Sequence, residues 1–191
     1  MTVRFKRYTY GLIVGRFQPF HHGHELMIAR ALDDCDKVVI CIGSAQESRT
    51  SRNPFTVEER ITLIKECFSE DLSRLIFVSL PDREVVRDDD TWGEYILNTI
   101  EHTAKVAVQA VFEGREACRQ PWFNSIEELD IIQISRVNEP FSATDVRNAL
   151  KEGNKDHYLA WCANNNESYY EDLRRIILDV EAKKINNHTS N

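Results

Sequence analysis

The chain has 191 residues, of which 42% are hydrophobic, which suffices for one compact α/β domain with a core but not for two full domains. Its net charge of −7 argues against broad nucleic-acid binding, although a few arginines can still define a positive pocket for a small phosphate ligand. No apolar run reaches the length of a membrane span and no signal peptide is visible, so we expect a soluble, cytoplasmic protein.

Five short β-rich runs recur along the chain, and helical periodicity fills most of the intervals between them. The runs lie at residues 10–14, 37–42, 75–78, 106–112 and 130–134. Because they are apolar almost throughout, we expect both faces to be buried, as is typical of a parallel sheet. Alternating strands and helices predict a doubly wound α/β fold, whose ligands bind beyond the carboxyl ends of the strands.

Capping signals mark the expected helix starts. Residues 56–59 (T-V-E-E) and 91–94 (T-W-G-E) both match the capping box, in which the first and fourth residues exchange hydrogen bonds. Residues 154–191 have the apolar spacing of helices and follow without a linker rich in proline or glycine. We therefore expect one domain over residues 1–153, with residues 154–191 as its helical C-terminal extension.

The densest functional signal is residues 15–24 (G-R-F-Q-P-F-H-H-G-H), directly after the first β run. Imidazole rings, a guanidinium group and the free amides of a helix start can together hold a polyphosphate. Gly23 would allow the backbone to approach such a ligand closely. Two alternatives are a surface turn that happens to be rich in histidine and a zinc site, although further zinc ligands at suitable spacing are not evident.

This block resembles the H-x-G-H signature and lead-in of the nucleotidylyltransferase superfamily. It is similar to the nicotinamide-mononucleotide adenylyltransferases of archaeal type and to the N-terminal half of bacterial bifunctional adenylyltransferase–Nudix enzymes. The resemblance covers residues 8–155 and implies a Rossmann-like nucleotidyltransferase fold. It also implies an enzyme that forms NAD and pyrophosphate from nicotinamide mononucleotide (NMN) and ATP. Nothing resembling a Nudix domain follows, so we expect the stand-alone transferase.

Residues 141–147 (F-S-A-T-D-V-R) are similar to the S-x-T-x-x-R motif of the same family. Ser142 can cap a helix that Gly153 would end, and the alternative is an ordinary capped helix. A cation such as Arg147 near a helix start favours an anion there. The resemblance implies an ATP site, and it implies that Arg16, His21, His24 and Arg147 are catalytic. The ATP-binding residues are Gly15, Arg16, Phe17, His21, His24, Gly114, Ser142, Thr144 and Arg147.

The mononucleotide side of the site is predicted from other segments. Residues 43–46 (G-S-A-Q) and 53–56 (N-P-F-T) resemble family segments, and the resemblance implies NMN contacts from Ser44, Arg52, Asp82 and Trp92. A lone tryptophan such as Trp92 is alternatively a core residue. The chain departs from the family by carrying Asp88, Asp89 and Asp90 where asparagine is common. Carboxylates there would repel the extra carboxylate of nicotinate.

Adenylyl transfer needs positioning and charge neutralisation more than covalent help. The mononucleotide phosphate attacks the α-phosphorus of ATP in line, and Mg²⁺ is expected to bind mainly through phosphates, without protein ligands. The expected partners are ATP, NMN and, from the resemblance, further copies of the chain, but no nucleic acid or membrane. The alternatives are a pantetheine-phosphate adenylyltransferase, a cytidylyltransferase or a non-catalytic nucleotide-sensing domain. The sequence leaves open nicotinamide against nicotinate mononucleotide, the preferred metal and the oligomeric state.

Overall fold

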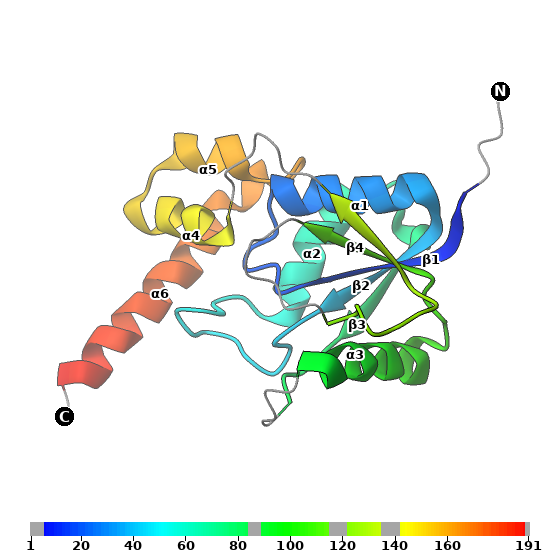
Figure 1. Cartoon of the computed structure of the whole chain (residues 1–191). Helices are drawn as coiled ribbons and strands as arrows, with labels where there is room; N and C mark the ends of the chain where they lie inside the picture. Colours follow the sequence, from blue (N-terminus) through cyan, green and yellow to red (C-terminus); the bar gives the residue numbers. More distant parts are fainter. Residues whose placement is uncertain (1–5, 84–88, 115–121, 135–141, 190–191) are drawn as a thin grey trace. The chain divides into compact units, whose positions relative to one another are not determined.

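The computed structural model describes residues 6–83, 89–114, 122–134 and 142–189 (Figure 1). The packing forms two compact units that alternate along the sequence. The first unit consists of Met1–Gly15, Leu26–Gly43 and Asp71–Asn138, and the second of Arg16–Glu25, Ser44–Glu70 and Glu139–Asn191. The domain boundary expected near residue 153 stays a prediction.

The first unit is built on a five-stranded sheet. Its strands are β1 (Tyr8–Gly15), β2 (Cys35–Ile42), β3 (Leu75–Ser79), β4 (Ala110–Gly114) and β5 (Asp130–Ile134). All neighbouring pairs are parallel and the strand order is β3-β2-β1-β4-β5. The order reverses between β1 and β4, so the expected doubly wound parallel sheet is confirmed, with its switch point at these two strands.

The fourth strand begins later than the apolar run predicts. Val106 and Val108 pack against the hydrophobic core while lying before β4. The backbone of Gln109 is already hydrogen-bonded to both neighbouring strands, to Tyr10 at 2.9 Å and to Asp130 at 3.0 Å. The apolar pattern therefore reflects contact with the core, and this contact begins before the first residue of β4.

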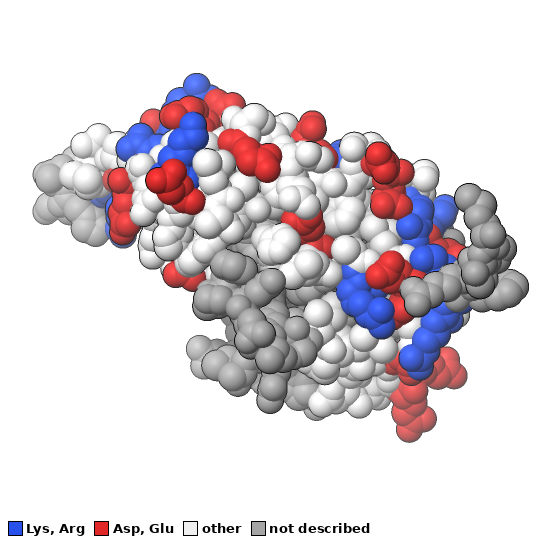
Figure 2. Space-filling view, turned by 90° about the horizontal axis from the view of Figure 1, so that it is seen from above, with Lys and Arg blue, Asp and Glu red and all other residues white. Residues whose placement is uncertain are grey.

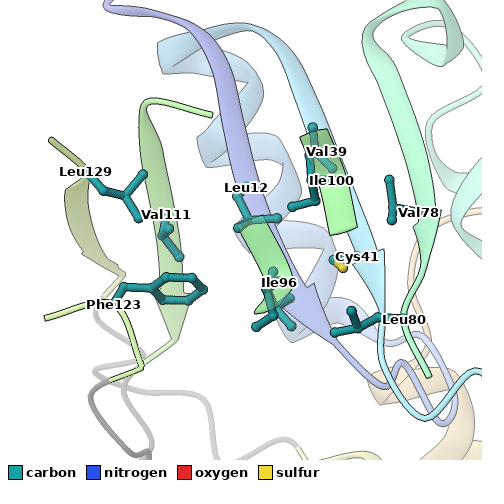
Figure 3. Close-up of a cluster of buried hydrophobic side chains, with 11 residues drawn as sticks. Leu12, Val39, Cys41, Val78, Leu80, Ile96, Ile100, Val111, Phe123 and Leu129 are labelled. Carbon is teal, nitrogen blue, oxygen red and sulfur yellow. The ribbon is translucent and has the colours of Figure 1, made fainter. Parts of the chain in front are cut away.

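One hydrophobic core cluster of the first unit lies on one face of the sheet and is covered by helix α3 (Asp89–Ala104). Figure 3 shows Ile96 and Ile100 of α3 over Leu12 and Val39 of the central strands. Helix α1 (His22–Asp34) lies over the opposite face in Figure 1. Because α3 begins at Asp89, Thr91 lies in its first turn, and the capping box predicted at residues 91–94 is wrong.

The second unit contains helices α2 (Val57–Cys67), α4 (Ala143–Glu152), α5 (Lys155–Trp161) and α6 (Tyr170–Thr189), with a 3-10 turn η2 (Glu167–Tyr169) before α6; a further 3-10 turn, η1 (Leu72–Arg74), belongs to the first unit. The capping box at Thr56 and Glu59 is confirmed, as is the cap of α4 by Ser142. Gly153 ends α4 with a φ of 75°, which glycine adopts without steric cost. None of the helices in the described ranges is long and apolar enough to cross a membrane.

Candidate active site

The turn after β1 is tied to the segment before α2 by the buried Gln18. Its side-chain amide donates to the carbonyl oxygen of Phe55 at 2.9 Å, and its Oε1 accepts from the Phe55 amide at 2.9 Å. The preceding residue, Phe17, is 1% exposed and has a φ of 52°. Such a backbone costs about 1–2 kcal/mol for a residue with a Cβ and is often retained at functional sites. The structure thus fixes the shape of the turn that leads to the histidines.

The hydrogen bonds of His21 define its protonation state. The Gly23 amide donates to Nδ1 of His21 at 3.1 Å. A backbone amide can only donate, so this Nδ1 carries no proton and the ring is neutral with its proton on Nε2. The His21 and His24 ring centroids are 3.8 Å apart, and His24 also packs on Phe17 at 4.8 Å. The motif therefore presents His21 as an N–H donor beside a second imidazole.

Two guanidinium groups gather at the same turn. Arg147 Nη1 donates to the carbonyl oxygen of Gln18 at 2.6 Å, and Nη2 donates to Thr144 Oγ1 at 3.1 Å. Burial lowers the pKa of Arg147, and the nearby positive charge of Arg16 lowers it further. Arg16 itself donates to Asn53 Oδ1 at 3.3 Å. Two neighbouring cations repel each other, and a bound anion would relieve that repulsion.

A cavity of about 140 Å³ lies beside Arg147 in the second unit. Its polar lining includes Thr144, Asn148 and Lys151 from α4, and its far wall comes from α6. Lys151 is held by Glu181 of α6 at 2.9 Å. This cavity leaves room for a small anionic group next to the predicted S-x-T-x-x-R residues.

Arg60 organises this part of the chain, a role that the sequence analysis did not predict. It is fully buried in α2 and donates to carbonyl oxygens of Thr56 at 3.1 Å, Arg16 at 2.9 Å and Ser44 at 3.4 Å. Burial lowers the pKa of its guanidinium. Ser44 has a φ of 48°, so Arg60 supports a second strained residue of the predicted site. The available signal was an arginine on the apolar side of an amphipathic helix.

In the loop before α2, the neighbouring residues Arg52 and Asn53 have different surroundings. Asn53 is 1% exposed, accepts from Arg16, and donates to Glu47 Oε2 at 2.5 Å. Arg52 is exposed, and among the described residues it has no hydrogen-bond or ion-pair partner. The structure therefore brings Arg16, not Arg52, into the cluster around Asn53.

The remaining predicted residues belong to the first unit. Gly15 and Gly114 end β1 and β4, the strands that flank the switch in strand order. Trp92 is half-buried at the start of α3, with its ring centroid 5.2 Å from Tyr95 and 6.1 Å from Trp122. It packs against the core, so the structure gives it a packing role whatever else it does.

Asp82 is exposed in the loop after β3. Asp88 lies outside the described residues, and so do the side chains of Asp89 and Asp90. The departure from the family at these three positions therefore stays a prediction. Residues 115–121, which follow Gly114, also lie outside the described residues.

The positive charge of Arg16 and Arg147 is not part of a wider basic surface on the face that Figure 2 shows. On the face shown in Figure 2, acidic and basic side chains lie interspersed and do not form a continuous basic surface. Within the described ranges, no group of three or more His, Cys, Asp or Glu side chains is arranged to hold a metal ion. The donors around the H-x-G-H turn are cationic or N–H groups, which suit phosphate oxygens.

This combination of fold and site defines a class of protein. The chain belongs to the cytidylyltransferase-like family, which it matches over residues 12–149. Its relatives include the nicotinamide/nicotinic acid mononucleotide adenylyltransferase of Acinetobacter baylyi, which is 34% identical over 77% of this chain and 78% of its own length. The nicotinamide-nucleotide adenylyltransferase of Thermococcus kodakarensis is 33% identical over 75% of this chain and 73% of its own length.

Solved structures give the same picture. The bifunctional NMN adenylyltransferase/ADP-ribose pyrophosphatase of Francisella tularensis aligns with 95% of this chain, with a TM-score of 0.76 and 26% identity. The chain spans about half of that protein, 54% of its length. A second structure of that enzyme contains AMP and a manganese ion, with a TM-score of 0.74. The Rossmann-like nucleotidyltransferase fold expected from the H-x-G-H block is confirmed.

Proposed function

We propose that this chain is a nicotinamide-nucleotide adenylyltransferase, which forms NAD and pyrophosphate from NMN and ATP. The observation that carries the proposal is the pair of neighbouring guanidinium groups at the turn that holds His21 and His24: Arg16 lies in the turn, and Arg147 reaches it from α4. The chain's family and the names of its relatives support the same reaction.

In this reaction an oxygen of the NMN phosphate attacks the α-phosphorus of ATP. The bond from the α-phosphorus to the bridging oxygen breaks, and pyrophosphate leaves with the electron pair. Negative charge grows on the transferred group and on the leaving group, so fixed donors lower the barrier. His21, through its Nε2–H, and His24 donate to the triphosphate, while Arg16 and Arg147 neutralise its charge.

The other predicted ATP contacts have supporting roles. Thr144 orients Arg147 through its hydroxyl, and Ser142 caps α4 while its own hydroxyl donates to Asp145 at 2.6 Å. Phe17 packs on His24, and Gly15 and Gly114, which carry no side chain, are the last residues of β1 and β4. Magnesium bound with the nucleotide would supply further charge neutralisation. The chain's own donors fit the phosphates of such a complex and leave the metal to them.

We also propose that Trp92 stacks on the nicotinamide ring, with Ser44, Arg52 and Asp82 on the mononucleotide side. Trp92 is half-buried within an aromatic group, which would support a flat ligand against it. A cationic pyridinium ring gains from the face of a tryptophan.

The reaction is tested by incubating the chain with ATP, magnesium and either NMN or nicotinate mononucleotide. Formation of NAD with one equivalent of pyrophosphate is the expected result, and the ratio of rates gives the base preference. Phosphopantetheine in place of NMN, and CTP in place of ATP, serve as alternative substrates. If neither mononucleotide forms a dinucleotide with ATP but one of these alternatives is turned over, the chain acts as a member of another branch of its family.

A further inference from the structure

The first turn of α1 also contains a buried carboxylate, which is not one of the predicted phosphate-binding residues. Glu25 is 8% exposed, and its two oxygens accept three hydrogen bonds. Oε2 accepts from His22 Nδ1 at 2.9 Å and from the amide of Asn164 at 3.2 Å, and Oε1 accepts from Asn164 Nδ2 at 2.6 Å. A buried carboxylate is stable only with such donors, so its place in the fold is well defined.

The thiol of Cys67, at the end of α2, belongs to the same group. Burial raises its pKa to about 12, and the charge of Glu25 and a hydrogen bond to it act in the same direction. Protonated Cys67 is therefore a further donor to the carboxylate. Glu25 thus connects the first turn of α1 with the end of α2 and with the segment between α5 and η2, and the residues concerned all belong to the second unit.

The backbone of Glu25 connects this group to the histidines. Its amide donates to the carbonyl oxygen of His21 at 3.1 Å, and the amide of His24 donates to the same oxygen at 2.8 Å. The Glu25 side chain, which is held by Asn164, is therefore part of the same first turn of α1 as the histidines. That turn includes the Gly23 amide, which fixes the proton of His21 on Nε2.

We propose that Glu25 is a positioning residue for adenylyl transfer, which acts with Asn164 to hold the H-x-G-H turn in its reactive geometry. The proposal rests on the proposed function. It makes the C-terminal segment around Asn164 a part of the catalytic unit, although Asn164 is 139 residues from Glu25 in sequence. A positioning role predicts a loss of turnover with little change in ground-state binding, because small displacements of reacting groups have large effects on rate.

The test compares Glu25→Gln and Asn164→Ala with the matched control Asp33→Asn, an exposed carboxylate on the same helix. Glutamine keeps the shape of glutamate but replaces one acceptor oxygen with a donor. We expect either variant to lower kcat at least roughly tenfold, with KM for ATP within about twofold of wild type. The double variant should lose no more than the larger single loss, because both changes break one network. Asp33→Asn should match wild type.

A second readout does not require turnover. In nitrogen-15 spectra of the imidazole rings, wild-type His21 should be a single Nε2–H tautomer, and both variants should show a mixture. If the wild-type chain makes no dinucleotide, the proposed function fails. The spectrum alone then decides whether Glu25 and Asn164 hold the H-x-G-H turn. A kcat within twofold of wild type in a folded variant would overturn the positioning role, as would an unchanged His21 tautomer. If Glu25→Gln does not fold, Asn164→Ala carries the test.

Discussion

His24 is partly buried between Phe17 and His21, at ring-centroid distances of 4.8 and 3.8 Å. Packing on both sides holds the ring in place before any ligand arrives, and such pre-organised donors contribute most where charge develops in the transition state. We predict that His24→Ala lowers kcat by roughly 100-fold and changes KM for ATP far less. Steady-state kinetics of NAD formation measure both constants.

The matched control for His24→Ala is His102→Ala, which removes an exposed imidazole at the end of α3. It should leave both constants unchanged. Equal losses in substrate binding and turnover for His24→Ala would show that His24 binds the ground state as strongly as the transition state.

Trp92 combines a packing role with the proposed ligand role. We predict that Trp92→Ala weakens NMN binding by roughly tenfold, as expected for the loss of a cation–π contact, and leaves ATP affinity nearly unchanged. Calorimetric titration of each ligand separates the two effects. Trp161→Ala is the control, because Trp161 packs on His157 in the second unit and has no proposed ligand. Equal weakening of ATP and NMN in Trp92→Ala would indicate a general loss of structure.

At the scale of a single helix, α2 depends on its capping box. Burial raises the pKa of Glu59, but hydrogen bonds from Arg49 and the Thr56 amide, together with the charges of Arg49 and Arg60, bring it below its ordinary value. Since the folded state favours the carboxylate, this group stabilises the fold above its unfolded pKa of about 4.3. The contribution is lost as the pH falls through the lower folded pKa.

We therefore predict that Glu59→Gln, which keeps a capping side chain, lowers the free energy of unfolding at pH 7 by less than about 1 kcal/mol. The difference from wild type should vanish once the pH is below the folded pKa of Glu59. Urea unfolding at a series of pH values measures it, with Glu70→Gln, an exposed carboxylate just after α2, as the control. A difference that stays constant down to pH 3 would assign the effect to shape and not to charge.

Helix α3 depends on a close backbone approach at Gly93. A Cβ at this position would lie 1.9 Å from the carbonyl oxygen of Trp122 and 3.2 Å from the ring of Phe123. We predict that Gly93→Ala destabilises the chain by about 1–3 kcal/mol, as overpacking does, even though alanine is the better helix former. Thermal unfolding checks this against Glu94→Ala, an exposed change one residue along. Stabilisation by Gly93→Ala would mean that the Trp122 turn moves away at little cost.

At the scale of the whole molecule, a ligand that binds only the folded state must stabilise it. At an ATP concentration 100 times Kd, we predict a gain of about 2.7 kcal/mol, which corresponds to a rise in Tm of roughly 5–10 °C for a chain of this size. Arg147→Gln should remove most of this shift, because it removes a guanidinium of the proposed triphosphate site. Arg175→Gln, an exposed change on α6, should retain it. A full shift in Arg147→Gln would place ATP elsewhere.

The sequence by itself determined those features that depend on neighbours along the chain. Apolar runs located the five strands, because burial on both faces of a parallel sheet leaves a continuous apolar segment. The caps at Thr56 and Ser142 were predictable because each is a bond between residues three apart. The H-x-G-H block was visible for the same reason, since its residues act within one turn.

Only the tertiary structure decided how those local pieces are held. The bond of Gln18 to Phe55 spans 37 residues, and that of Arg147 to Gln18 spans 129. Local periodicity carries no information on such pairs, so Gln18 and Arg60 were missed, as was the contact of Glu25 with Asn164. The residues proposed for catalysis lie in short sequence motifs. The geometry of the candidate site depends on buried polar side chains that connect these motifs over long sequence distances.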